Sequence, residues 1–183
     1  MTLSSREEAD HSTSEQLALE PYLRAVAAAL SAPNATAETV LKAARARGAR
    51  RIDAFVEFAV PDPRVVTASL RLGEEYFAGP PPRWGEFRPD LPPSSVEFRL
   101  RRDGSPVTLA EVAQAFGTWT DDVAGTTPEQ PYLVQFTTFY PPELVPARPD
   151  GPLTHVMLSL AARPQTKDVR VRSVLLRRFG GNP

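Results

Sequence analysis

Residues 52–60 read IDAFVEFAV, and their alternation of apolar and other side chains decides the fold class. The positions of one parity are Ile52, Ala54, Val56, Phe58 and Val60. A period of two is typical of a strand that buries one face. Residues 66–72, VTASLRL, repeat the pattern after the turn at residues 61–63, PDP. The two stretches therefore predict an antiparallel pair of strands.

Four further stretches predict strands along the rest of the chain. Val96, Phe98 and Leu100 alternate with charged residues, and residues 132–140, 154–162 and 169–179 form the second group of three strands. Because no helix separates the strands within a group, we expect antiparallel pairing.

Helix signals precede the two groups of strands. Ser12 and Glu15 have the spacing of a capping box and predict a helix to about residue 32. A second helix is expected over residues 36–47, with Gly48 as its C-cap. Thr108 and Glu111 form another capping box and predict a third helix, which ends at Gly117.

The expected order is α-α-β-β-β-α-β-β-β, or helix plus three strands twice after an extra helix. About six largely antiparallel strands with three helices predict an α+β fold. The helices either cover one face as a two-layer sandwich or leave a curved-sheet cone around a pocket. Residues 1–13 are expected to be a flexible polar tail, and residues 14–183 a single domain.

Composition excludes several classes of protein. The chain has 183 residues, a net charge of -1 and no cysteine, so disulfide scaffolds, thiolate metal sites and cysteine nucleophiles are excluded. No stretch approaches the roughly 20 apolar residues of a membrane span, and the N-terminus has no apolar signal core. We expect a cytoplasmic protein with no membrane association.

Catalytic signatures are missing from the sequence, and we expect the protein not to be an enzyme. The chain has no Gly-rich phosphate loop, no metal-ligand spacing and no nucleophile elbow, so we predict no cofactor and no metal. If it were an enzyme, His155 as a base and Asp53, placed on the parity of Phe55 with a raised pKa, would carry the chemistry. His11, the other histidine, lies in the expected tail.

The proline-rich stretch at residues 79–93 is the most distinctive local feature. Proline lacks the backbone N–H and fixes φ, so we expect a long loop without a helix or an inner strand. Residues 141–152 predict a second such loop. In the first loop Arg83, Trp84 and Phe87 are of the types that concentrate binding energy at interfaces, and they are candidate binding residues.

The C-terminal third is basic. Its cations extend from Arg163 to Arg178, and Arg99, Arg101 and Arg102 would join them if the strands at residues 96–100 and 169–179 are neighbours. Recognition of nucleic acid also needs an aromatic platform or a groove-reading helix. The aromatic residues of 132–140 are better interpreted as core, so we do not expect nucleic-acid binding.

Two functions remain from different classes. The first is a non-enzymatic protein-interaction module, such as a chaperone, an adaptor or an immunity-type protein, with a protein partner or a homo-oligomer as its complex. The second is a small-molecule-binding protein or simple acid–base enzyme with a pocket in a curved sheet. Candidate pocket residues are Phe55, Tyr132, Phe136 and Tyr140.

The interaction hypothesis predicts the effect of removing the tryptophan of the proline-rich loop. Trp84→Ala is expected to weaken a complex with a protein partner by at least about tenfold, because buried tryptophans concentrate binding energy. The dissociation constant measured with the purified complex checks this expectation. Trp84→Phe, which keeps an aromatic ring, is the control and should retain most of the affinity.

Overall fold

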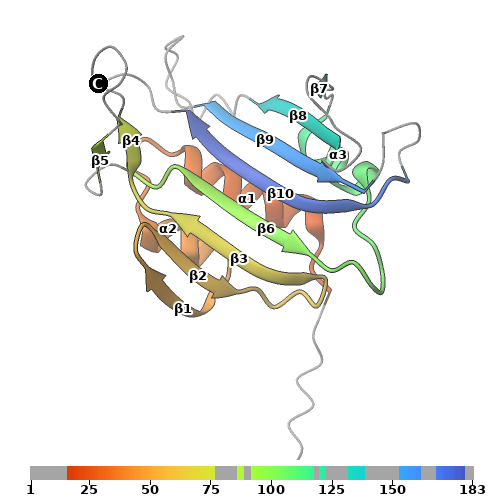
Figure 1. Cartoon of the computed structure of the whole chain (residues 1–183), viewed down its shortest axis with the longest axis horizontal. Coiled ribbons are helices and arrows are strands. Elements are labelled where there is room, and N and C mark those ends of the chain that lie inside the picture. Colours follow the sequence, from red (N-terminus) through yellow and green to blue (C-terminus); the bar gives the residue numbers. More distant parts are fainter. Residues whose placement is uncertain are drawn as a thin grey trace, which may run out of the picture.

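The fold is an α+β arrangement of one large sheet and three helices, seen in a computed structural model (Figure 1). The structure describes residues 16–76, 86–88, 92–117, 120–122, 132–138, 153–161 and 168–179. The helices are α1 (Leu19–Ser31), α2 (Ala37–Ala43) and α3 (Leu109–Phe116). The strands are β1 (Arg47–Ile52), β2 (Phe55–Ala59), β3 (Val65–Arg71), β4 (Glu74–Tyr76), β5 (Glu86–Arg88), β6 (Ser95–Leu100), β7 (Thr120–Asp122), β8 (Tyr132–Thr138), β9 (Leu153–Leu160) and β10 (Val171–Phe179).

Eight strands form one open antiparallel sheet in the order β1-β2-β3-β6-β10-β9-β8-β7. The helices lie behind this sheet in Figure 1, on one of its faces. The six expected strands are β2, β3, β6, β8, β9 and β10, and with the three helices they confirm the predicted α+β class and order. The described sheet is not closed, which favours the two-layer arrangement over the cone.

The large sheet is built from two similar halves. Helix α2 is followed by β1, β2, β3 and β6, and helix α3 is followed by β7, β8, β9 and β10. The last strands of the two halves, β6 and β10, pair antiparallel at the centre. Helix α1 packs against both α2 and α3. The predicted unit of a helix plus three strands is therefore a helix plus four strands, since each half has an additional edge strand.

Strand register separates the core from the solvent-facing side chains. Val56, Leu70, Val96, Leu176 and Val156 follow one another across five paired strands, and every one is buried. A second buried row of Phe58, Ala68, Phe98, Val174 and Leu158 runs beside it. Alternation with period two puts these rows on the helix side and every intervening residue on the opposite face.

Helix α1 fills the space beneath the sheet. Leu23, Val26 and Leu30 are buried at spacings of three and four, which places them on one face. The ring of Tyr22 packs edge-on against Phe98 with the centroids 5.8 Å apart, and its hydroxyl donates to the Ala44 carbonyl at 2.9 Å. Burial raises the pKa of this hydroxyl. Tyr22 therefore links α1 both to the sheet and to the end of α2.

The second helix is shorter than predicted, and Gly48 is not its C-cap. Thr36 caps its N-terminus by accepting from the Thr39 N–H, but the helix ends at Ala43. Arg45 has a φ of 51°, and the Ala46 N–H donates to the Leu41 carbonyl at 3.0 Å. This is the Schellman geometry, with arginine where glycine is usual. Gly48, at a φ of 59°, instead lies in the β1 bulge.

The predicted strand at residues 52–60 is two strands in the structure. Asp53 and Ala54 form a two-residue turn between β1 and β2, and Asp53 has a φ of 51°. Short polar side chains tolerate this backbone conformation better than most, which explains the turn. The alternation of residues 66–72 predicts that Val66 lies on the buried face, and this prediction is wrong. A bulge between Val65 and Thr67 leaves the Val66 side chain exposed to solvent.

Three other predictions concern the ends of elements. The first helix begins at Leu19, while the expected capping box at Ser12 and Glu15 and the tail at residues 1–13 lie outside the described residues. The third helix is confirmed, since Thr108 and Glu111 form the capping box and Gly117 follows the last residue. Residues 79–93 were expected to contain no helix and no inner strand, and the strand that lies there, β5, pairs only with β4 in a separate two-stranded sheet, where it is not an inner strand.

A buried ionic network joins the two layers at one end of the sheet. Asp62 and Arg64, in the β2–β3 turn, are 3% and 6% exposed. The Arg64 guanidinium donates to Asp62 at 2.8 Å, to Glu111 of α3 at 3.2 Å and to the Leu17 carbonyl at 3.2 Å. The Leu17 N–H donates back to Asp62 at 3.3 Å. The network therefore connects the approach to α1, a sheet turn and the first turn of α3.

The unusual C-terminus of α2 predicts that Arg45→Gly stabilises the protein by about 1 kcal/mol, because glycine adopts a positive φ without a Cβ clash. The free energy of unfolding in urea measures the change. Arg47→Gly is the control, since Arg47 lies in β1 at an ordinary φ and glycine there should destabilise by about 0.5–1 kcal/mol. Equal effects at the two positions would contradict this explanation.

The ionic network predicts an acid-sensitive contribution to stability. Burial alone would raise the pKa of Asp62, but hydrogen bonds from Arg64 and Leu17 and the Arg64 charge lower it below its usual value. Its contribution is therefore complete above the pKa of an unfolded aspartate, about 4, and is lost as the pH falls through the lower folded value. Asp62→Asn should cost about 3 kcal/mol at pH 7 because it removes the carboxylate beside a buried guanidinium.

Urea unfolding of the native chain and Asp62→Asn at neutral pH and at about pH 2.5 measures this contribution. The difference between the two proteins should shrink at the acidic pH, because the unfolded native chain takes up a proton there at Asp62 more readily than the folded chain does. A difference that stays constant between the two pH values would show that the network is not the source of the acid sensitivity.

Candidate binding surface

The sheet face opposite the helices is a broad surface across the eight strands of the large sheet (Figure 1). We call it the open face and define it by three rows of paired residues. The first row is Arg50, Glu57, Ser69, Glu97, Leu175 and Met157. The second is Phe55, Arg71, Ser95 and Arg177, and the third is Thr67, Arg99, Ser173 and Ser159. All of these side chains are exposed or half-buried.

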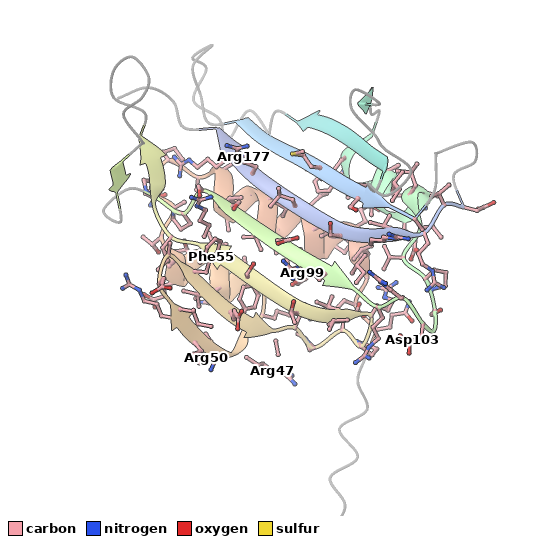
Figure 2. The ribbon with its side chains drawn as sticks, viewed as in Figure 1. Arg47, Arg50, Phe55, Arg99, Asp103 and Arg177 are labelled. Atoms are coloured by element: carbon pink, nitrogen blue, oxygen red, sulfur yellow. The ribbon has the colours of Figure 1, made fainter. Side chains whose placement is uncertain are left out.

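Arginines outnumber carboxylates on the open face. Arg50 and Glu57 form an ion pair at 3.4 Å, and Arg99 lies 3.6 Å from Glu97. Exposed pairs of this kind contribute little to stability, so both arginines are available to exchange partners. Arg71 and Arg177 also lie on this face, and Figure 2 labels Arg99 and Arg177 there. The open face is therefore net positive.

An exposed apolar patch lies beside the β1–β2 turn. Phe55 is 42% exposed and Ile52, its partner in the register, is 37% exposed. The guanidinium of Arg71 lies over the Phe55 ring, 5.7 Å from its centroid. A cation held over an aromatic ring is a favourable contact that keeps the ring on the surface. Phe55 is thus presented to solvent by its strand parity and is not drawn into the core.

The two edges of the sheet have opposite charge. Every residue of β1 is exposed, and this strand carries Arg47, Arg50 and Arg51. At the far edge, β7 has the sequence Thr-Asp-Asp and includes Asp121 and Asp122. Two acidic pairs, at residues 74–75 and 121–122, lie in β4 and β7. Charged edge strands are a usual protection against uncontrolled pairing.

The two residues proposed for catalysis are not brought together. Asp53 is exposed in the β1–β2 turn, and His155 lies on β9 in register with Arg177 of β10. Strands β3, β6 and β10 lie between β2 and β9. At about 4.8 Å per strand, the two backbones are separated by roughly 19 Å. Each residue was proposed as a polar group by itself, so its catalytic role stays a prediction.

Three of the four proposed pocket residues lie in described strands, and their register divides them between the two faces of the sheet. Phe55 lies on the open face. Tyr132 and Phe136 are in register with the buried residues Leu160 and Val156, on the helix-side rows. Tyr140 lies outside the described residues. The register therefore does not assemble Phe55 with the β8 aromatics around a common cavity.

The proposed loop site is only partly described. Arg83 and Trp84 lie outside the described residues, and Phe87 is in β5 with Glu75 of β4 as its partner in the register. The β4–β5 pair is a separate two-stranded sheet and does not extend the large one. The binding role of this segment stays a prediction.

Sequence reasoning missed that the polar parity of the strands forms one continuous surface. The signal was present, because Arg71, Glu97 and Arg99 occupy the positions opposite the buried ones. Only the strand order shows that these positions lie side by side on one face of the sheet. The expectation that Arg99 would join the C-terminal cations is met, since β6 and β10 are neighbours and Ser173 pairs with Arg99. Arg170 also donates to the backbone carbonyls of Arg102 and Gly104.

Compared with protein-family models, curated proteins and solved structures, the chain matches none. Among the described residues, no group of three or more His, Asp or Glu side chains is placed to hold a metal ion. None of the helices in the described part of the chain is long and apolar enough to cross a membrane. The function has to be inferred from the chemistry of the open face itself.

Proposed function

We propose that the protein is a non-enzymatic protein-interaction module that binds its partner on the open face of the sheet. The observation that carries this proposal is the one-sided cover of the sheet, which leaves a broad mixed surface of arginine and apolar side chains in solvent. We further propose a cytoplasmic protein whose partner is another protein or a second copy.

The size of the open face fits a protein partner. Eight strands at about 4.8 Å spacing and about 20 Å length give a face of roughly 700 Å². A standard protein–protein interface buries about 800 Å² on each partner. Small ligands instead occupy concave sites that enclose most of their surface. The dimensions therefore favour a macromolecule.

The chemistry of the open face also favours a protein. Interfaces are enriched in arginine, aromatic residues and methionine relative to the remaining surface. Arg99, Met157 and Leu175 lie near the middle of this face, and Phe55 lies toward one side. The half-buried Leu175 and Met157 supply apolar contact, while the arginines supply directional hydrogen bonds.

The alternative, a small-molecule or acid–base site, has no comparable support. Among the described residues, Phe55 is in the open-face register, whereas Tyr132 and Phe136 are in the helix-side register. The open face also carries no aromatic platform for nucleic-acid bases among its described residues apart from Phe55, while recognition of single strands uses several stacked rings.

Photo-crosslinking in cells tests the proposal. A benzophenone amino acid in place of Leu175, in the first row of the open face, should give a discrete crosslinked protein band. The same amino acid in place of Ala25, exposed on α1 on the helix side, is the matched control and should not. The captured protein is identified by mass spectrometry, and its affinity for Leu175→Glu should be at least about tenfold weaker than for Ala25→Glu.

Each substitution in that comparison adds one negative charge, so a general electrostatic effect would weaken both variants equally. Crosslinking from position 25 but not from position 175, or no product from either, would contradict an interaction on the open face.

A further inference from the structure

The two edges of the large sheet are complementary to each other in direction, in face and in charge. We infer that β1 of one copy pairs with β7 of a second copy, so that the sheet continues from molecule to molecule. This inference goes beyond the proposed function, because it assigns a separate interaction surface to the edges.

Strand direction allows the pairing. The sheet has eight strands and every neighbouring pair is antiparallel, so β1 and β7 run in opposite directions. A second copy displaced sideways within the plane of the sheet keeps its orientation. Its β1 then meets β7 of the first copy as an antiparallel neighbour, and both open faces stay on the same side. An odd number of strands would have made this contact parallel.

The faces of the charged residues match as well. Arg50 pairs with Glu57 and Arg51 with Val56, so their positions belong to the open face and to the helix side, respectively. Asp122 pairs with Leu133 in the open-face register, and Asp121 with Val134 in the helix-side register. An antiparallel register that puts Arg50 opposite Asp122 also puts Arg51 opposite Asp121. Each face of the new pair would then carry one opposite-charge pair.

Charge favours the pairing of β1 with β7 over the pairing of two β1 strands or of two β7 strands. Two β1 edges would bring arginines together, and two β7 edges would bring aspartates together, both of which are unfavourable across a strand pair. Charged edge strands commonly prevent association altogether. Of the possible pairings between the two edges of the large sheet, only β1 with β7 brings opposite charges together. Within the described residues, Arg47 has no salt bridge and Arg51 donates only to the Asp53 carbonyl.

The geometry makes the association head-to-tail. A contact between two different surfaces of one chain leaves a free edge at each end, so assembly continues until a ring closes or the supply of chains ends. The contact uses one short strand, which is at the weak end of interface sizes. We therefore expect a concentration-dependent series of small oligomers that salt weakens, because its charge pairs are exposed.

Sedimentation equilibrium of the full chain, at concentrations up to about 1 mM and at low and high salt, measures this association. Arg50→Asp with Arg51→Asp makes both edges acidic, and Asp121→Arg with Asp122→Arg makes both edges basic. Each double variant alone should lose at least about tenfold in association constant. Arg102→Asp with Arg172→Asp, exposed positions away from both edges, is the charge-matched control and should associate as the native chain does.

Mixing the two edge variants gives the decisive result. Every acidic edge then meets a basic edge on the other variant, so the association constant should return in the mixture while each variant alone stays at least about tenfold weaker. Native monomers at every concentration, equal loss in the control, or no recovery on mixing would overturn the edge pairing. Crosslinking from position 175 tests the open face independently of the edges. A negative result for edge pairing is therefore distinguishable from a negative result for partner binding on the open face.

Discussion

The charged contact of Arg64 with Asp62 and Glu111 is the constraint from which the arrangement of layers follows. The network joins the β2–β3 turn to α3 and to the backbone that leads into α1. Glu111 also caps its own helix, because its other carboxylate oxygen accepts from the Thr108 N–H at 2.8 Å. A buried guanidinium without these acceptors would be costly, so the three segments are held in one relative position.

With the helices held on that side, the open face is a geometric consequence. Two buried rows face α1, and strict alternation turns the other half of every strand outward. The outward side chains of the open face are charged, small or half-buried apolar, apart from the exposed ring of Phe55, and they do not form a second core. Such a surface is stable in water while still offering arginine, leucine and methionine to a partner. Side chains of one parity therefore stabilise the fold by packing against the helices, while side chains of the other parity are available to a binding partner.

The halves of the sheet share a plan but differ at their outer edges. The helix that precedes each half, α2 or α3, begins with a threonine cap. Each buries a valine four residues after that threonine, Val40 in α2 and Val112 in α3. The edge strands differ in charge, since β1 carries arginines and β7 carries aspartates. The two halves therefore have a similar architecture, but the sheet has a basic edge at β1 and an acidic edge at β7.

The sequence by itself determined the third helix, the α+β class and the strand parities other than those of Ile52 and Val66, because these depend on local periodicity and on capping between near neighbours. It misplaced the end of α2 and the β1–β2 turn, where Arg45 and Asp53 adopt positive φ without the usual glycine. Only the tertiary structure decided that Arg71, Arg99 and Arg177 share one surface and that β1 and β7 form the two edges. Those relations depend on which distant strands pair, and a pattern of period two is the same for every strand order.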